Sequence, residues 1–205
     1  MIDMLKGCSK VNSGVRREQI TQASLDIIAS DGVKGLTTSA IAGRVGISGA
    51  NLYRHFQNKD EILNSVVAKI GADLRQNLRA VHDAAPEDPL LKLKKLFRRH
   101  LEYTENNKGI PRLVFSEEMH ITNVPLKEKL LRIINSYTKE ISSLIRDGQE
   151  AGIIKQNMDP QALALTMVGL IQVTLLKWSL NGFSFSPVDQ GMKLWKNFEG
   201  CISAK

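Results

Sequence analysis

Five neighbouring side chains in one short stretch have the chemistry needed to recognise nucleic acid. They are a small residue that permits close approach, an amide, a phenol, a guanidinium and an imidazole, from Ala50, Asn51, Tyr53, Arg54 and His55. On a helix that lies in the major groove of duplex DNA, such groups hydrogen-bond base edges and phosphates. We assign four more residues to this surface, two at the start of the helix and two as flanking phosphate contacts: Ser48, Gly49, Thr38 and Lys59.

The residues around this stretch predict two short helices joined by a sharp turn. Ile41 and Val45 lie four residues apart, so both point inward from the first helix. Gly46 follows where a left-handed backbone conformation would end that helix, and Ile47 fills the corner. Ser48 can cap the second helix, whose apolar residues return to the same core at i and i+4, namely Leu52 and Phe56.

This motif does not by itself establish a DNA-binding function. Many all-helical proteins join two helices at a glycine with apolar corners and never touch DNA, and Arg54 and His55 are ordinary surface residues in isolation. A helical small-molecule-binding or catalytic protein, in which the motif is only scaffold, is therefore an alternative interpretation. Gly43 inside the first short helix also costs up to about 1 kcal/mol relative to alanine, so that helix must depend on its packing.

The stretch from Arg16 to about Leu63 resembles the N-terminal domain of the tetracycline-repressor (TetR) family. The matching features are an Arg-Arg pair that opens the first helix, Gly32 that ends it, and short matches in fixed order: Thr37-Thr38, Ile41-Ala42, Gly46-Ile47-Ser48, Leu52-Tyr53, His55-Phe56 and Lys59-Asp60-Glu61-Ile62-Leu63. The rest of the chain resembles the family in architecture only. The resemblance implies a dimeric repressor that a small-molecule inducer releases from a near-palindromic operator in double-stranded DNA. A regulator that activates, or one that answers to another protein, would use the same motif.

The fold class that we expect is all-α, with about nine helices and no sheet, since no long segment alternates as a strand does. Capping residues predict the starts of later helices, at Asn58, Asp88-Pro89, Asp159-Pro160 and Ser186-Pro187. We expect three parts: an N-terminal arm (1–15), a helix-turn-helix DNA-binding domain (16–62), and a helical-bundle ligand-binding and dimerisation domain (63–205).

The resemblance also implies that the C-terminal domain forms a homodimer and encloses a cavity for a largely apolar small molecule. By that analogy the eighth and ninth helices form the interface. Apolar residues surround the eighth helix from Leu163 to Trp178, which is typical of a helix buried on two faces or of a monomer's core helix. The candidate cavity residues, each also explained as plain core, are Phe97, His100, Leu101, Phe115, Tyr137, Met167 and Trp178.

Composition sets broader limits. The chain has 205 residues, with 28 Lys and Arg against 21 Asp and Glu, and the net charge of +7 favours an anionic partner such as nucleic acid. Cys8 and Cys201 are typical of reduced thiols rather than a disulfide framework. The most apolar segment, 163–180, is interrupted by polar residues, so we expect a soluble cytoplasmic protein with no membrane partner.

The sequence gives no support for an enzyme, a cofactor or a metal site. It contains no phosphate-binding glycine loop, nucleophile elbow or metalloprotease motif. His82, His100 and His120 are far apart in sequence and lack the close spacing of metal ligands.

Overall fold

The computed structural model describes residues 12–83 and 88–204, and these residues form an all-α fold, as expected from the sequence. Within them lie nine α-helices, a 3-10 turn, a π-helical turn and one isolated antiparallel bridge. In chain order the elements are α1 (Ser13–Asp31), η1 (Val33–Gly35), α2 (Thr38–Val45), α3 (Gly49–Tyr53), α4 (Lys59–His82), α5 (Pro89–Glu105), α6 (Gly109–Val114), η2 (Glu118–Thr122), α7 (Val124–Glu150), α8 (Pro160–Leu180) and α9 (Pro187–Ile202).

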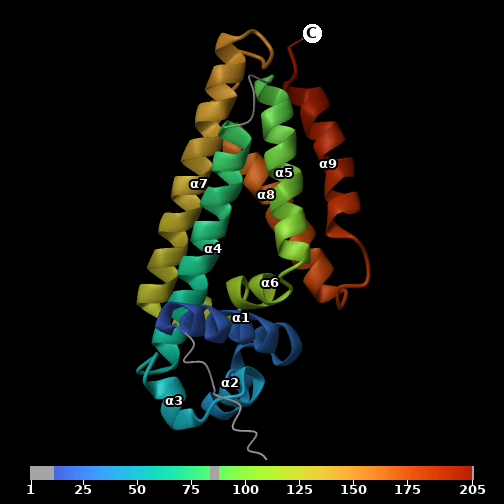
Figure 1. Ribbon diagram of the computed structural model, residues 1–205. Coiled ribbons are helices and arrows are strands. Elements are labelled where there is room, and N and C mark those ends of the chain that lie inside the picture. The colour runs from blue at the N-terminus through green and yellow to red at the C-terminus, as the bar shows by residue number, and fades with distance from the viewer. Residues whose placement is uncertain (1–11, 84–87, 205) are drawn as a thin grey trace, which may run out of the picture.

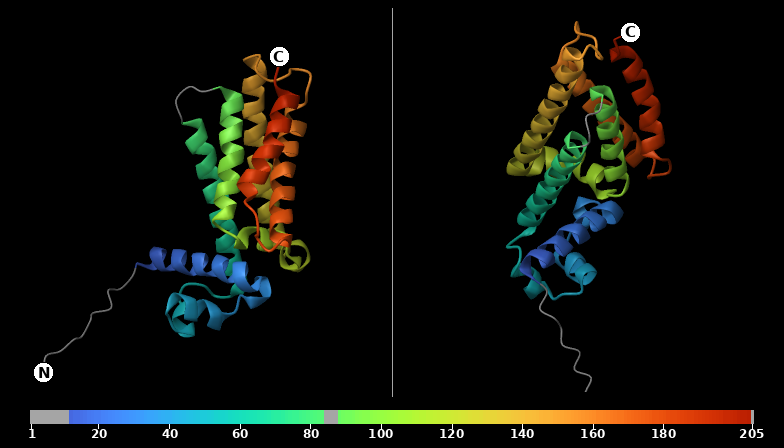
Figure 2. Two further views of the ribbon diagram at one scale, coloured as in Figure 1. Left: turned by 90° about the vertical axis from the view of Figure 1, so that its right-hand side faces the viewer. Right: turned by 45° about the horizontal axis from the view of Figure 1, so that its top comes forward.

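The molecule has two visibly different regions. Figure 1 shows α1, α2 and α3 gathered at one end, with the long helices standing above them and the C-terminus at the far end. We call residues 13–63 the head and residues 64–83 and 88–204 the body. The helix α4 starts in the head and runs up into the body, and α1 lies across the base of the body (Figure 2).

The turn between α2 and α3 has the predicted construction. Gly46 is in the left-handed conformation, with φ 72° and ψ 39°, so it ends α2 where a side chain would be strained. The side chain of Ser48 caps α3 and that of Asn58 caps α4. Leu52 and Phe56 return to the head core, as their i, i+4 spacing predicted.

One predicted boundary differs from the structure. The helix α1 begins at Ser13, so the last residues assigned to the N-terminal arm are helical, whereas residues 1–11 lie outside the described part. Further along the chain, α6 and η2 are two separate short elements, divided at residues 115–117. Ser116 explains the division, because its hydroxyl donates to the Leu113 carbonyl and accepts from the Met119 N–H, competing with helical backbone bonds.

The predicted starts of α5, α8 and α9 are confirmed: each begins at a proline that follows a capping Asp88, Asp159 or Ser186.

Among the described residues, α8 is the one helix long and apolar enough to cross a membrane by length and composition. The expectation that its polar residues would exclude this was wrong on those two criteria. The helix nevertheless packs against α5, α7 and α9, and 44% of its most apolar window is buried inside the protein. A core helix of a globular protein passes the same test.

Candidate DNA-binding surface and ligand cavity

The outer side of α3 carries the side chains that the sequence assigned to DNA contact. Ala50, Tyr53 and Arg54 are exposed, and the Tyr53 side chain has more than half of its surface open to solvent. Asn51 is half-buried, and its backbone N–H is bonded to the capping hydroxyl of Ser48 at 3.2 Å. The structure therefore brings together a guanidinium, an amide and a phenol on one short, capped helix.

The starts of α2 and α3 meet at one point of this surface. The hydroxyls of Thr38 and Tyr53 are hydrogen-bonded at 3.2 Å. Gly49 lies beside them, since a Cβ there would be 3.8 Å from the Thr38 methyl group. Two hydroxyls placed together in this way can contact one phosphate group.

Arg17 positions this surface and was missed as a functional residue in the sequence. Its guanidinium donates to the His55 carbonyl at the end of α3 and to the Glu61 carboxylate, at 3.0 Å, in the first turn of α4. It also lies over the Phe56 ring, 4.0 Å from the centroid. Because one planar group joins α1, the residues that follow α3, and α4, it holds α3 in place within the head. The only sequence signal was the Arg16-Arg17 pair.

The Glu61 carboxylate is held in its charged form. The backbone N–H of Gln57 donates to it at 2.7 Å, and this bond, followed by the Arg17 guanidinium, holds the pKa of Glu61 below its usual value. The Asn58 side chain accepts from the Glu61 N–H at 2.8 Å. The predicted cap of α4 is thus part of a network that includes Arg17.

His55 and Lys59 are less free than the sequence suggested. The His55 ring is half-buried, with Nδ1 3.4 Å from the Ser13 hydroxyl of α1, so it faces the start of α1. The Lys59 ammonium donates to the Val33 carbonyl at 3.2 Å. An ammonium has three donors, so Lys59 retains two for a phosphate.

The head has a continuous basic segment. Residues 32–59 contain no Asp or Glu, and their four cations are Lys34, Arg44, Arg54 and Lys59. All four side chains are exposed in the structure. Lys34 and Arg44 were not assigned to DNA contact from the sequence, where the absence of acidic residues over this span was the available signal. A surface of this kind attracts the phosphate backbone.

The body contains a small interior cavity, which we call the inner cavity. Its volume is about 50 Å³, and α4, α5, α6, α7 and α8 all contribute to its wall. Three residues assigned to a ligand from the sequence line it: His100, Phe115 and Tyr137. The remaining wall is mainly apolar, for example Ile110 and Val114 of α6 and Val168 and Leu175 of α8.

The other four assigned residues lie outside this cavity. Phe97 contacts Trp195 with ring centroids 5.4 Å apart, and Leu101 occupies the space beside Gly191, so both belong to the contact between α5 and α9. Met167 is fully buried in α8, and Trp178 packs edge-on against Phe183 at 4.6 Å. Their burial is explained by packing, because an apolar helical stripe looks the same whether it faces a cavity or a neighbouring helix.

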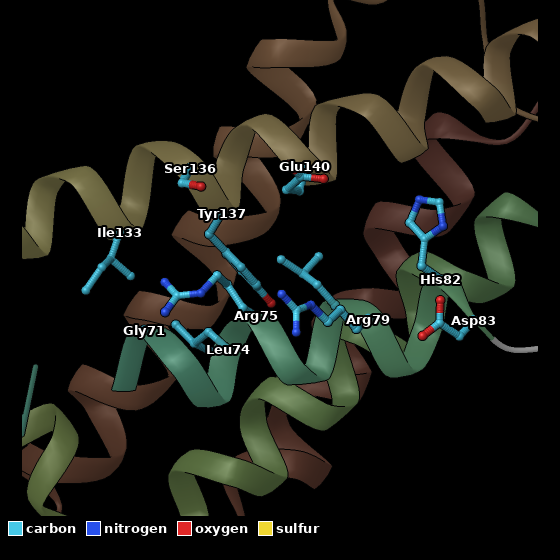
Figure 3. Close-up of a pocket in the computed structure, with 11 residues that line it drawn as sticks. Gly71, Leu74, Arg75, Arg79, His82, Asp83, Ile133, Ser136, Tyr137 and Glu140 are labelled. Carbon is cyan, nitrogen blue, oxygen red and sulfur yellow. The ribbon is translucent and has the colours of Figure 1, made fainter. Parts of the chain in front are cut away.

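A larger cleft, the outer cleft, lies between α4 and α7. Its volume is about 380 Å³, and it shares Leu74, Ile133 and Tyr137 with the inner cavity. Figure 3 shows Arg75 and Arg79 extending from α4 into the gap, with Tyr137 reaching down from α7 beside them. Its other polar side chains are His82, Asp83, Ser136 and Glu140.

His100 and Tyr137 form a buried polar pair where the two spaces meet. Nδ1 of His100 lies 3.2 Å from the Tyr137 hydroxyl, and the two rings are in edge contact. Burial lowers the pKa of His100 from 6.5 to about 4 and raises the pKa of Tyr137. Both groups are therefore neutral near pH 7, and the inner cavity contains no charge from them.

The short helix α6 belongs to both regions of the molecule. It contributes Ile110, Pro111 and Val114 to the wall of the inner cavity. It also touches α1 directly, because a Cβ at Gly109 would overlap the Leu25 carbonyl oxygen. Arg112 donates to the Ala29 and Ser30 carbonyls near the end of α1, at 2.5 and 3.0 Å.

Arg112 also contacts the loop that follows α8. Its guanidinium lies over the Phe183 ring, 5.0 Å from the centroid. Phe183 has φ 62°, a left-handed conformation that a phenylalanine rarely adopts and that tertiary packing must maintain. One side chain thus joins the head to the loop between α8 and α9.

Within the described residues, no three His, Cys, Asp or Glu side chains are grouped so that they could hold a metal ion, and we assign no metal site there.

Comparisons with known proteins match two segments of the chain. Residues 20–66 match the family of bacterial regulatory proteins known as the tetR family, and residues 89–185 match the tetracyclin repressor-like C-terminal domain. The nucleoid occlusion factor SlmA of Vibrio cholerae is 23% identical over 192 residues, which cover 93% of this chain and 96% of that protein.

Solved structures show the same fold. The Bacillus subtilis regulator FadR, crystallised with stearoyl-CoA, superposes with a TM-score of 0.74 at 22% identity, covering 88% of this chain and 96% of its own. The Bacillus halodurans FadR gives a TM-score of 0.80 at 20% identity, with 90% and 95% covered.

The head matches the tetR family of bacterial regulatory proteins and most of the body matches its repressor-like C-terminal domain, so the class of this protein is a DNA-binding transcription regulator. The chain belongs to the TetR family. The family resemblance read from Arg16 to Leu63 in the sequence is confirmed.

Proposed function

We propose that this protein is a dimeric repressor that holds a near-palindromic operator through α3 and is released from it when a small molecule enters the body. The observation that carries this proposal is the double position of α6, which lines the inner cavity and contacts α1. Any change in the cavity that displaces α6 must also displace α1 or break these contacts. In support, a FadR relative of the same fold was crystallised with stearoyl-CoA.

On the DNA side, we assign base contacts to the outer side of α3 and phosphate contacts to its borders. Asn51 and Arg54 carry the amide and guanidinium that bind adenine and guanine edges in pairs of hydrogen bonds. Thr38 and Tyr53, whose hydroxyls already adjoin, contact phosphate. Arg44 and Lys59, on the basic segment 32–59, add long-range attraction for the phosphate backbone.

The dimer interface in this proposal uses α8 together with α9. The outward face of α8 carries Leu165, Val173 and Leu180, each more than half exposed, and Gly169, whose missing side chain leaves open space. An apolar helix face of this kind is typical of a surface that a second subunit covers. A two-fold axis there would present two copies of α3 about one DNA turn, roughly 34–36 Å, apart.

Release follows from the small size of the inner cavity. A volume of about 50 Å³ has room for one or two water-sized groups and is far below the 300 Å³ or more of ordinary small-molecule sites. A ligand must therefore enlarge the space by moving part of its wall. The six-residue helix α6 is the shortest element of that wall, and its displacement acts on the end of α1 through Gly109 and Arg112.

DNA binding is tested with the full-length protein and the duplex upstream of its own coding region, by fluorescence anisotropy at low and moderate salt. We expect binding that weakens steeply with salt, because counterion release drives phosphate contacts. Arg54→Ala and Asn51→Ala should change the base preference by about 1–3 kcal/mol at single positions, while Tyr53→Phe should weaken all duplexes alike. Arg132→Gln on α7, an exposed arginine outside the residues assigned to DNA contact, is the matched control and should keep wild-type binding.

The absence of duplex binding by the dimer at low salt would contradict this function. It would favour a helical small-molecule-binding protein in which the head is scaffold. An unchanged base preference in both α3 variants would instead show that other residues enter the groove.

The dimer assignment has a separate test in molar-mass measurement by light scattering. Leu165→Glu and Val173→Glu should each shift the protein toward the monomer, because a charge on each subunit would be buried at the interface. Leu131→Glu changes an equally exposed leucine on α7 and should leave the dimer intact. A dimer that survives both α8 substitutions would place the interface elsewhere.

The small inner cavity also favours a second candidate, a DNA-binding regulator that answers to another protein rather than to a small molecule. Such a regulator would bind duplex in the same way but would need no ligand-sized space. Calorimetric titration with small molecules separates the two candidates, because only the ligand-released repressor should bind one.

A further inference from the structure

The two spaces in the body have opposite chemistry and meet at shared residues. The inner cavity is lined mainly by aliphatic and aromatic side chains, and its polar groups are His100, Tyr137 and Gln172. The outer cleft is lined by charged side chains on both helices that border it. Leu74, Ile133 and Tyr137 belong to both linings, so a ligand longer than either space would extend from one into the other.

Two guanidinium groups define the outer cleft on its α4 side. Arg75 and Arg79 are four residues apart, so they lie one above the other on the same helix face (Figure 3). Within residues 12–83 and 88–204 neither guanidinium forms a hydrogen bond or ion pair, although Asp83 and Glu140 line the same cleft. Like charges at this spacing repel each other. An anion bound between the two guanidinium groups would be attracted by both and would offset their repulsion.

The inner cavity would not accept such an anion. Its walls are apolar, and His100 is neutral there because burial lowers its pKa to about 4. An ionised group placed in it would lose its hydration without gaining an opposite charge. The charged end of a ligand must therefore remain in the outer cleft.

The two helices that border both spaces approach each other closely where the spaces adjoin. At Gly71, α4 approaches α7 so closely that a Cβ would lie 2.8 Å from the Ile133 side chain. Ile133 lines both spaces, so its side chain lies where a ligand would have to cross from one to the other. A crossing point between two close helices suits a slender unbranched chain better than a rigid ring system.

We propose that the ligand is an amphiphile whose unbranched acyl chain enters the inner cavity and whose anionic head, a carboxylate or a phosphate, binds between Arg75 and Arg79. This inference rests on the proposed ligand-released function and names the class of ligand for it. Planar guanidinium groups bind both kinds of anion through paired, charge-assisted hydrogen bonds. Growth of the cavity around the chain would displace α6 and hence α1.

The test is calorimetric titration of the full-length protein without DNA, using four probes. Dodecanoate and dodecanoyl-coenzyme A supply the carboxylate and the phosphates, dodecan-1-ol supplies the same chain without charge, and coenzyme A supplies the phosphates without a chain. We expect dodecanoate, dodecanoyl-coenzyme A or both to bind at least about ten times more tightly than dodecan-1-ol. Coenzyme A alone should bind weakly. The tighter of the two anionic probes identifies the head.

Variants test the assigned residues directly. Arg75→Gln and Arg79→Gln should each weaken the anionic probe about tenfold, and the double variant about a hundredfold, while the affinity for dodecan-1-ol stays within about twofold. Arg132→Gln removes the same charge from an exposed position of α7 outside both spaces and should leave all four affinities unchanged.

Two results would overturn the inference. One is that no chain-bearing probe binds; the other is that the alcohol equals the anions or that the double variant keeps its affinity for them. A third result separates the two proposals. Arginine-dependent binding that leaves the protein's affinity for its upstream duplex unchanged would support this inference and refute the ligand-released function.

Discussion

The proposed sites in the head and in the body are built from the chain in opposite ways. The proposed DNA surface comes from one continuous stretch, Thr37 to Lys59, in which each turn and helix start is fixed by a nearby side chain. The proposed ligand site takes residues from five helices that span Ile70 to Leu175. Local chemistry therefore decides the first site, and packing over long sequence distances decides the second.

The largest expected effect is on the pH dependence of stability, and it comes from His100, which is buried in the body. Its pKa falls from 6.5 unfolded to about 4 folded, so between these values the unfolded chain binds more protons and acid favours unfolding. We expect the free energy of unfolding to lose up to about 3 kcal/mol through this group as the pH falls from 6.5 to about 4. Urea denaturation at fixed protein concentration measures it.

His100→Leu should remove this part of the pH dependence. Tyr137→Phe is the control, and it should retain the dependence because burial, rather than the hydrogen bond to Tyr137, is its cause. Equal pH profiles for wild type and His100→Leu would contradict the assignment.

A second prediction concerns the junction between the two regions. Gly109→Ala places a Cβ against the Leu25 carbonyl oxygen, which is backbone and cannot turn aside. We expect the free energy of unfolding to fall by about 1–3 kcal/mol, the usual cost of overpacking, together with weaker operator binding. Denaturation and anisotropy measure the two effects. Full stability in this variant would show that α6 and α1 are not tightly joined.

A third prediction compares equivalent caps in the two regions. Ser48→Ala removes the cap of the five-residue helix α3 and should cost about 1 kcal/mol of stability and weaken operator binding. Asp159→Ala removes the cap of α8, a helix of 21 residues, and should cost a similar stability without changing operator affinity. Loss of operator affinity in both variants would contradict the local character of the head.

The smallest expected effect is a gain. Gly43 lies inside α2, is exposed, and has no atom within 4 Å of where a Cβ would be. Gly43→Ala should raise the free energy of unfolding by up to about 1 kcal/mol, because alanine loses less backbone entropy in a helix. It is also the matched control for Gly109→Ala, since the same substitution meets open space at one site and backbone at the other.

More of the head than of the body could be predicted from the sequence. The caps at Ser48, Asn58 and Asp88, the left-handed Gly46 and the buried pair Leu52 and Phe56 were all predicted correctly. Arg17 was missed, because its partners are 38 to 44 positions away in the sequence: His55 and Phe56 follow α3, and Glu61 lies in α4.

In the body, the periodicity located buried stripes but could not say what each stripe faces. His100 and Leu101 are neighbours on α5, yet one lines the inner cavity and the other packs beside Gly191 of α9. The charged outer cleft gave no signal at all, since Arg75 and Arg79 look like ordinary surface residues until α7 is placed opposite them.

By itself the sequence determined most helix ends and the turn between α2 and α3, because caps, glycines and prolines act over a few residues. Only the tertiary structure decided which apolar side chains enclose a space, which arginines share a cleft and which short helix contacts α1. Those relations join residues tens of positions apart, and they exist only when the long helices are packed together.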